Sequence, residues 1–328
     1  MFARPQWLIL LLVLIAGLVW WRVPADTQQL SRTALIMGTL VEIRAFGDDQ
    51  QQLNQAISDA FAEMTRLEDL LSSHRPDSDV ARLSSAEKTV KVSAETAKLL
   101  QLGQQVALRS GGAFDMTLGA VKQLWAIETD HPQIPTAEQL QTALHGIGPR
   151  ALQIDGTQVT KSVPALQVDL GGIAKGYAVD RALAVLRRAG IRSAAVNAGG
   201  DIGLLGDRQG QPWRIGIQHP RNKGQLLTTL RLADRAVVTS GDYERFFERD
   251  GVRYHHIFDP HSGQPARRSQ SVTVVAADAA SADALATAAF VLGPRAGLKL
   301  LEDWPAVEGL LVAADGTVYQ TSGLQRSD

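Results

Sequence analysis

The chain has 328 residues, of which 45% are hydrophobic and 20% are charged, and this composition is that of a globular protein rather than a disordered or collagen-like one. Its formal net charge is -1, so it lacks the basic excess of a nucleic-acid-binding protein. The absence of cysteine excludes disulfides, thiolate metal sites, a cysteine nucleophile and a lipid-modified cysteine anchor.

The N-terminus is strongly apolar. Residues 7–21 (WLILLLVLIAGLVWW) contain only apolar residues and glycine. This stretch is long for the apolar part of a signal peptide and slightly short of the roughly 17–25 residues of a membrane-spanning helix. Its flanking tryptophans suit a membrane interface, and residues 23–25 (VPA) suit a signal cleavage site. We therefore expect residues 1–25 to be a hydrophobic helix that acts as a signal sequence or, as the flanks favour, an uncleaved membrane anchor.

The remainder, residues 26–328, contains no repeat and no low-complexity run, which indicates one domain. Apolar periodicity and turn residues predict strands over 39–46 and 194–197, helices over 51–71, from 93 to 110, over 177–188 and over 283–292, and Asp-Gly hairpins over 152–159 and 311–319. Hairpins and helices are mixed without regular βαβ alternation. The sequence therefore predicts an α+β fold with mixed sheets and flanking helices rather than a doubly wound sheet.

A glycine-rich segment, residues 169–176 (DLGGIAKG), leads directly into a predicted helix. Glycines let backbone N–H groups approach a ligand, and a helix N-terminus favours phosphate, with which Lys175 could pair. The spacing matches neither of the two common nucleotide-binding glycine patterns. From these residues alone, a structural turn fits the segment as well as an anion site does.

Asp283 and Thr287 are four residues apart and share one face of a predicted helix. A carboxylate and a hydroxyl suit a hard cation such as Mg2+, which takes its other oxygen ligands from phosphates and waters. A helix N-terminus disfavours a cation unless anions accompany it, so this site makes sense beside a pyrophosphate. Taken alone, Asp283 fits better as an acid that stabilises the first turn of its helix.

Three histidines, His255, His256 and His261, are close in sequence, but their spacing matches no zinc motif, and Pro260 and Gly263 mark a turn. A single histidine that acts as a base or lines a pocket is favoured over a metal cluster. Read in isolation, residues 111–115 (GGAFD) are a helix stop followed by a loop, and residues 239–242 (TSGD) contain a capping serine.

These motifs, in their order along the chain and in their residues, resemble those of the FAD:protein FMN transferase family, also called ApbE. The matching blocks are MGT at 37–39, LSSHRPDS at 71–78, GAFD at 112–115, VDLGGIAKGYAVD at 168–180, VNAGGD at 196–201, TSGDY at 239–243, HIFDP at 256–260 and ADALAT at 282–287. One residue departs from the pattern, because His74 stands where this family usually has a tyrosine.

The resemblance implies a single α+β domain that transfers FMN from FAD to a threonine or serine hydroxyl of a target protein and releases AMP. It implies that the flavin cleft is lined by Met37, His74, Ala113, Phe114, Asp115, Asp169, Lys175 and Ile257. It also implies that Mg2+ is held by the side chains of Asp283 and Thr287 and the backbone carbonyl of Gly172. His256 would deprotonate the acceptor hydroxyl, as a histidine near the reference pKa of about 6.5 can do.

In such families the acceptors are typically subunits of membrane electron-transport complexes, among them sodium-pumping NADH:quinone reductase. We accordingly expect the protein at the bacterial inner membrane facing the periplasm, or in the periplasm if residues 1–25 are removed. Two rival functions stay open: an Mg2+-dependent hydrolase that converts FAD to FMN and AMP, which the departure at His74 leaves open, and a non-catalytic exported flavin-binding protein. A pure carrier would not need the Asp283 and Thr287 face.

Overall fold

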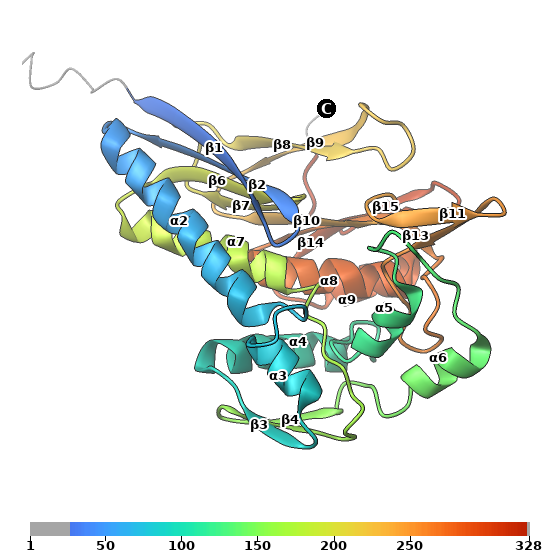
Figure 1. Cartoon of the computed structure of the whole chain (residues 1–328). Helices are drawn as coiled ribbons and strands as arrows, with labels where there is room; N and C mark the ends of the chain where they lie inside the picture. Colours follow the sequence, from blue (N-terminus) through green and yellow to red (C-terminus); the bar gives the residue numbers. More distant parts are fainter. Residues whose placement is uncertain (1–26, 327–328) are drawn as a thin grey trace, which may run out of the picture.

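The computed structural model describes residues 27–326, which form an α+β fold built on one large antiparallel sheet (Figure 1). The strand order of this sheet is β1-β2-β6-β7-β10-β13-β14-β15. Its strands are β1 (Gln28–Ile36), β2 (Thr39–Gly47), β6 (Ser193–Ala198), β7 (Asp201–Leu205), β10 (Ala236–Gly241), β13 (Ser269–Ala276), β14 (Glu308–Ala313) and β15 (Val318–Gln320). Every neighbouring pair is antiparallel, which confirms the predicted α+β class.

A layer of helices covers one face of this sheet (Figure 1). It consists of α2 (Gln50–Leu71), α7 (Ala174–Arg188), α8 (Ala279–Leu292) and α9 (Pro294–Glu302). Helix α8 is buried around nearly its whole circumference, because alanine and other apolar residues occupy almost every position. It packs against β10 and β13 on one side and against α7 on the other. The most buried helix of the fold thus carries the residues for which a metal role is predicted.

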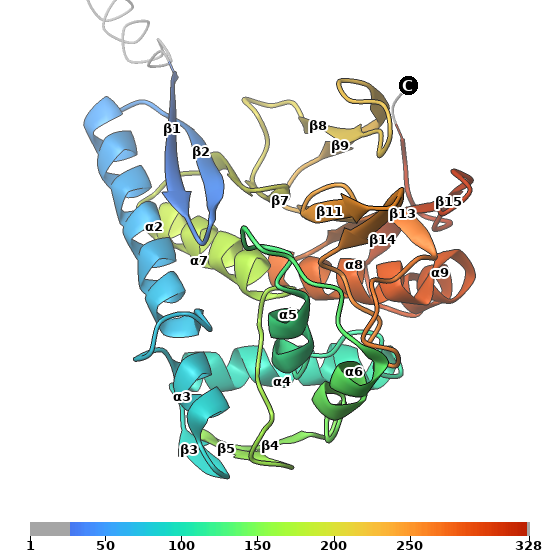
Figure 2. The same ribbon diagram turned by 45° about the vertical axis from the view of Figure 1, so that its right-hand side comes forward.

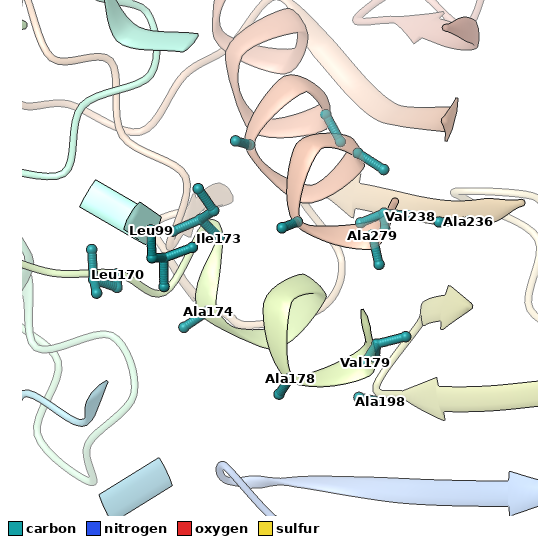
Figure 3. Close-up of a cluster of buried hydrophobic side chains, with 14 of the residues drawn as sticks. Leu99, Leu170, Ile173, Ala174, Ala178, Val179, Ala198, Ala236, Val238 and Ala279 are labelled. Atoms are coloured by element: carbon teal, nitrogen blue, oxygen red, sulfur yellow. The ribbon is translucent and has the colours of Figure 1, made fainter. Parts of the chain in front are cut away.

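Helices α7 and α8 cross in direct backbone contact near their N-termini. A Cβ atom added to Gly176 would lie only 2.2 Å from the carbonyl oxygen of Ala279, so no larger residue fits there. Figure 3 shows Ala174, Ala178 and Ala279 among the small side chains at this crossing. The absence of bulk lets the glycine-rich segment before α7 and the first turns of α8 lie side by side.

Smaller elements lie beyond the helix layer or flank the large sheet (Figure 2). Helices α3 (Asp79–Ser85), α4 (Ala94–Arg109), α5 (Gly119–Trp125) and α6 (Ala137–Ala143) accompany a three-stranded sheet of β3 (Thr89–Lys91), β5 (Gln158–Lys161) and β4 (Leu152–Asp155). Two further hairpins are formed by β8 (Trp213–Gln218) with β9 (Leu226–Leu232) and by β11 (Phe246–Arg249) with β12 (Val252–His255). One hydrophobic core connects the large sheet, the helix layer and helices α3 and α4.

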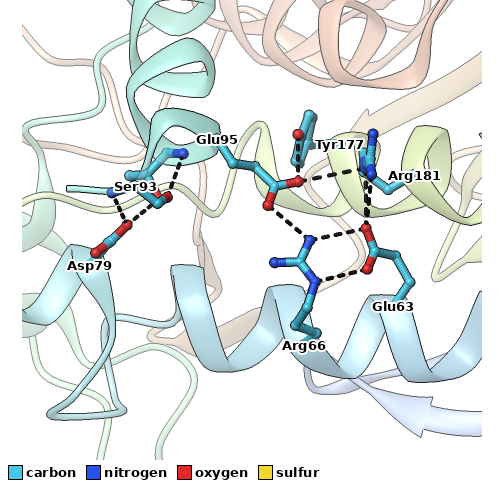
Figure 4. A network of polar contacts seen from close by, with 8 residues as sticks. Glu63, Arg66, Asp79, Ser93, Glu95, Tyr177 and Arg181 are labelled. Atoms are coloured by element: carbon cyan, nitrogen blue, oxygen red, sulfur yellow. Dashed lines mark hydrogen bonds and ion pairs between the residues drawn. The ribbon is translucent and has the colours of Figure 1, made fainter. Parts of the chain in front are cut away.

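A polar network ties α2, α4 and α7 together at the edge of the core (Figure 4). Arg66 of α2 donates to Glu63 and to Glu95 of α4, each at 2.8 Å. Glu95 also accepts a hydrogen bond from the hydroxyl of Tyr177, and Arg181 donates a hydrogen bond to Glu63. These groups are partly exposed, so we expect them to fix the relative positions of the helices more than to add stability.

Most elements predicted from periodicity are present, and several are longer than predicted. Helix 51–71 corresponds to α2, and the helix that follows Ser93 corresponds to α4, with Ser93 as its N-cap. The Asp-Gly hairpins correspond to β4-β5 and β14-β15. The predicted helices over 177–188 and 283–292 lie within α7 and α8, which begin earlier, at Ala174 and Ala279.

The hydrophobic helix predicted for residues 1–25 lies outside the described residues. Among residues 27–326, no helix combines the length and the apolar composition needed to cross a membrane.

Candidate active site

The glycine-rich segment 169–176 forms the floor of a cleft. Its first residue is tied to the preceding loop, since the N–H of Asp169 donates to the carbonyl of Met116 at 2.8 Å. A Cβ atom added to Gly172 would lie 3.2 Å from both the Phe114 ring and Thr287 Oγ1. The segment is therefore packed between an aromatic residue and helix α8, and a larger residue at position 172 would require these side chains to shift.

The three predicted metal ligands lie together. Asp283 is buried, and its Oδ2 accepts a hydrogen bond of 3.2 Å from the backbone N–H of Gly176. Thr287 lies one turn further along α8, next to Gly172, with its Oγ1 at 3.5 Å from Ser240 Oγ. A carboxylate and a hydroxyl in this cradle are hard oxygen donors of the kind that Mg2+ uses. The residues present thus fit the cation that the resemblance implies.

Asp201 completes this polar cluster, although it was not among the predicted site residues. It begins β7, is 2% exposed, and accepts a 2.8 Å hydrogen bond from Lys175 Nζ. The same ammonium lies 3.5 Å from Asp283 Oδ2. Burial, and next the nearby charge of Asp283, raise the pKa of Asp201 above its usual value. In the sequence, only the position of Asp201 at the end of the VNAGGD block, residues 196–201, pointed to a role in the site.

Lys175 was predicted to pair with a phosphate, and in the structure it pairs with two carboxyl groups. Burial alone would lower the pKa of Lys175, but Asp201 and then Asp283 raise it above its usual value. The ammonium is therefore charged at neutral pH. It is a cation that the protein itself supplies beside Asp283.

The cleft has three adjoining lobes. The first lobe, of about 470 Å³, is lined by all the predicted site residues except Met37 and His74, namely Ala113, Phe114, Asp115, Asp169, Gly172, Lys175, His256, Ile257, Asp283 and Thr287. Met37 and His74 line the second lobe, of about 830 Å³. The third lobe, of about 260 Å³, is lined in part by His74, His256 and Phe258. The structure thus brings the predicted residues into one continuous cleft.

The lining of the first lobe changes from apolar to polar. Ala113 and Phe114 are buried and provide apolar surface. Beside them, Asp115 Oδ1 accepts from the N–H of Thr117 at 2.8 Å and from its hydroxyl at 2.6 Å. Burial raises the pKa of Asp115 above its usual value. Pockets for organic cofactors commonly combine apolar walls with a few fixed polar groups of this kind.

A chain of alternating charges separates the lobes, and it is formed largely by residues that the sequence did not single out. Lys122 Nζ lies 3.1 Å from Asp169 Oδ2 and 3.5 Å from Glu128 Oε1. Arg245 donates to Glu128 Oε2 at 2.6 Å. Lys122, Glu128 and Asp169 line all three lobes. No sequence motif pointed to Lys122, Glu128 or Arg245.

His256 lies between the first and third lobes, with its Nδ1 at 3.3 Å from the carbonyl oxygen of Arg245. Burial lowers its pKa to about 4. The expectation of a pKa near 6.5 is therefore wrong, because burial removes the water that would stabilise the imidazolium. At neutral pH the ring is uncharged and able to accept a proton.

The other two histidines do not converge on His256. His255 is buried, with Nε2 at 2.7 Å from the carbonyl oxygen of Ala266, and it also accepts the N–H of Ile257. His261 is exposed and pairs with Asp259. Within residues 27–326, no group of three His, Cys, Asp or Glu side chains is arranged to hold a metal ion. Of the three histidines, His256 lines the first lobe, and its role as a base stays a prediction.

The two predicted residues outside the first lobe lie on less regular structure. Met37 is in the turn between β1 and β2 with a positive φ of 54°, and His74 is exposed in the loop after α2. Both line the second lobe with Leu71 and Phe246. Met37 and His74 therefore line a different part of the cleft from Asp283 and Thr287, the predicted metal ligands.

The N-termini of α7 and α8 lie close together and are capped differently, although the Gly176 N–H of α7 donates to Asp283 Oδ2. The first N–H groups of α8 donate to Asp180 at 2.7 and 2.9 Å and to its N-cap, Asp278, at 2.8 Å. Burial raises the pKa of Asp180 to about 7. Helix α7 has no side-chain cap hydrogen bond. The N-terminus of α7, which carries Lys175, is thus the better place for an anion.

The fold and this cleft define a class of α+β protein whose cleft combines apolar walls with fixed charged groups. The family model described as "ApbE family" matches residues 37–311. A Treponema pallidum (strain Nichols) protein named FAD:protein FMN transferase is 36% identical over 323 residues, which cover 92% of this chain and 89% of that protein.

Solved structures agree with this match. The ApbE protein of Thermotoga maritima superposes with a TM-score of 0.82 at 35% identity, covering 90% of this chain and 97% of its own. The flavin transferase ApbE of Vibrio cholerae gives a TM-score of 0.80 at 32% identity, covering 90% and 98%. The chain belongs to the ApbE family, and the resemblance drawn from its motifs is confirmed.

Proposed function

We propose that this protein is an Mg2+-dependent FAD:protein FMN transferase, which moves FMN from FAD to a threonine or serine hydroxyl of a target protein and releases AMP. One observation carries the proposal. The oxygen donors Asp283 and Thr287, the ammonium of Lys175 and the neutral imidazole of His256 all line the same lobe. The names of the relatives support the choice of FAD and of a protein acceptor.

Asp283, Thr287 and the backbone of Gly172 would hold the cation. When bound, Mg2+ neutralises phosphate oxygens and stabilises the charge on the AMP leaving group. The ammonium of Lys175, 3.5 Å from Asp283 Oδ2, indicates that this place favours positive charge. Lys175 and the N-terminus of α7, which has no N-cap side-chain hydrogen bond, would bind the pyrophosphate from the same side.

In the transfer itself, the acceptor hydroxyl oxygen forms a bond to the phosphorus of the FMN half. The bond between that phosphorus and the oxygen bridging to AMP breaks, and the hydroxyl proton passes to His256. A neutral histidine is required for this step, and burial keeps His256 neutral at pH 7. The fixed walls of the cleft would place attacking oxygen and leaving group in line.

We further propose that FAD extends from the first lobe, where Phe114 lies, into the second lobe, where Met37 and His74 lie. In this arrangement Lys122 and Arg245, which belong to the charge chain between the lobes, would lie near the connecting part of the ligand. Pockets that hold a large cofactor typically bury most of its surface between elements of this kind.

The location and the partners follow from the N-terminus and the family. Residues 7–21 are apolar throughout, and we propose that they hold the protein at the inner membrane facing the periplasm, or direct it there before cleavage. The acceptors would then be flavin-carrying subunits of membrane electron-transport complexes. Such subunits can present a threonine or serine to a neighbour anchored in the same membrane.

Hydrolysis of FAD to FMN and AMP is a second candidate function. It is favoured by one observation, namely that His74 is exposed where the family's tyrosine would cover the flavin. With less cover, water reaches the cleft and competes with the acceptor hydroxyl.

The test uses the full-length chain in detergent, FAD, Mg2+ and the flavin-carrying subunit of a sodium-pumping NADH:quinone reductase as acceptor. Intact mass of the acceptor and free nucleotide are measured together. A gain of one FMN with equimolar AMP supports the transferase. Free FMN and AMP with an unmodified acceptor support the hydrolase, and unconsumed FAD overturns both.

A further inference from the structure

The Lys175 ammonium lies beside Asp283, the carboxylate that would bind the proposed cation. Its Nζ is 2.8 Å from Asp201 Oδ2 and 3.5 Å from Asp283 Oδ2. Asp283 Oδ2 also accepts the backbone N–H of Gly176. Asp283 Oδ2 therefore already accepts one backbone hydrogen bond and lies within ion-pair distance of the Lys175 ammonium.

The two partners of this contact differ in freedom. Asp201 lies on β7, a strand that pairs with both β6 and β10, and its side chain is 4% exposed. Lys175 lies in the first turn of α7, and its four-carbon stem ends in a head that can move while the helix stays in place. Asp201 is thus a fixed anchor, and the Lys175 ammonium is the part that can change partners.

We propose that the Lys175 ammonium is a latch that keeps a divalent cation off Asp283 until a pyrophosphate enters the first lobe, and that Asp201 moderates this latch by holding Nζ away from Asp283. The inference rests on the proposed function for the cation site and for the pyrophosphate. An entering anion gives the ammonium a new partner, so that Nζ turns toward phosphate and away from Asp283 Oδ2. Cation and nucleotide then bind together, and the protein does not fill its cation site beforehand.

Asp201 is a positioning residue in this arrangement. It holds Nζ closer to itself than to Asp283, as the distances of 2.8 and 3.5 Å show. Without that anchor, the ammonium would have Asp283 as its one carboxylate partner in the cluster and would compete more strongly with the cation. Substitutions of Lys175 and of Asp201 should therefore change cation affinity in opposite directions.

The first measurement uses Mn2+ alone as the probe, with the full-length chain in detergent and neither FAD nor acceptor present. Free Mn2+ is read by electron paramagnetic resonance. We expect Lys175→Met to bind Mn2+ at least about 10-fold more tightly than the wild type, within the roughly 5–150-fold range of coupled binding equilibria. Unchanged or weaker binding overturns the latch.

Lys122→Met is the matched control. It removes one positive charge from the same cleft, but Lys122 pairs with Asp169 and Glu128 and not with Asp283. We expect its effect to stay within about 3-fold, as for screened charges that make no contact with the site. If both substitutions tighten Mn2+ binding equally, the cause is the general field of the cleft, and the latch is overturned.

The second measurement is a double-mutant cycle. Asp201→Asn, which is close to isosteric, should weaken Mn2+ binding in the wild type and have less than about a 2-fold effect in the Lys175→Met background. A penalty that persists in the double variant would mean that Asp201 attracts the cation directly, against the proposal. Circular dichroism checks each fold, and Lys175→Gln replaces Lys175→Met if the latter does not fold.

These outcomes are separate from those of the transfer assay. If Mn2+ binds to neither the wild type nor the Lys175 variant at millimolar concentration, the cation site and the latch fail together. If the Mn2+ pattern is as expected but no acceptor is labelled, the latch stands and the proposed transferase function fails.

Discussion

The two sides of the cleft are built in different ways. One side, here called the helix wall, consists of Gly172, Lys175, Asp201, Asp283 and Thr287 around the crossing of α7 and α8. The other side, here called the loop wall, consists of His74, Lys122, Glu128 and Arg245, which line the second lobe mostly from loops. Both sides carry charges, but different forces position them.

Backbone packing holds the helix wall in place. Asp283 and Asp201 are 3% and 2% exposed, and Gly176 leaves no space between the two helices. The loop wall depends on ion pairs such as Arg245 with Glu128, whose side chains are 37% and 31% exposed. Exposed ion pairs are screened by water and are worth little each. We therefore expect substitutions in the helix wall to have large effects and those in the loop wall to have small ones.

The largest effect is expected for Asp283→Asn. This change keeps the size of the side chain and an acceptor for the Gly176 N–H, but it removes the charge. We expect kcat/KM for FMN transfer in Mg2+ to fall by about 1000-fold, the upper range for loss of one preorganised electrostatic group. Thermal unfolding should change little.

The matched control is Asp278→Asn, which alters the N-cap of the same helix without touching the cleft. Asparagine caps a helix as well as aspartate does, so transfer should be unchanged. An Asp283→Asn enzyme that keeps full activity in Mg2+ would remove the cation from the proposed function and abolish the contrast between the two walls.

Gly176→Ala tests whether backbone contact positions the helix wall. The added Cβ would lie 2.2 Å from the carbonyl oxygen of Ala279, and backbone cannot rotate away as a side chain can. We expect a loss of about 3 kcal/mol, the upper range for overpacking. The midpoint of thermal unfolding should then fall by roughly 6–12 °C. Arg187→Ala, at an exposed site of the same helix, should leave it within about 2 °C. Equal midpoints for both variants would contradict a rigid crossing.

His256 lies between the two walls and is expected to show an intermediate effect. His256→Ala should slow transfer at least about 100-fold, as is usual for loss of a general base, while FAD affinity changes little. Equal losses in rate and in FAD affinity would make His256 a binding residue.

The pH dependence of the wild type sharpens this assignment. Transfer requires neutral His256, and burial lowers its pKa to about 4. As pH falls, the rate should therefore stay level through pH 6 and 5 and drop only near pH 4, where the imidazole becomes protonated. A drop centred near pH 6.5 would show that the ring is hydrated during the reaction and that the site opens.

The difference between the walls also explains what could be predicted from the sequence. Asp283 and Thr287 are four apart on one helix, so local spacing predicted their shared face, while the family resemblance supplied their site role and that of Lys175. Arg245 and Glu128 are 117 residues apart and meet only through tertiary structure. Asp201 was hidden for the same reason, because its contacts come from α7 and α8 and not from its own strand.

Burial was the other quantity that local patterns could not supply. The lowered pKa of His256 and the raised pKa of Asp201 come first from desolvation by the assembled fold. The starts of α7 and α8 were placed too late for a related reason. Residues 279–282 are apolar or small and buried on all sides, so they show no helical periodicity, and the glycine-rich segment concealed the start of α7.

The smallest effect is expected in the loop wall, for His74→Tyr. His74 is exposed in the second lobe, and a tyrosine there would offer a larger aromatic face to the flavin. Aromatic contacts add about 0.5–1.5 kcal/mol, so FAD should bind about 2- to 10-fold more tightly, as measured by quenching of flavin fluorescence. The same cover should reduce the release of free FMN relative to labelled acceptor. His145→Tyr, an exposed change outside the cleft, should alter neither quantity. If His74→Tyr weakens FAD binding, the flavin does not lie in the second lobe, and the loop wall serves the acceptor instead.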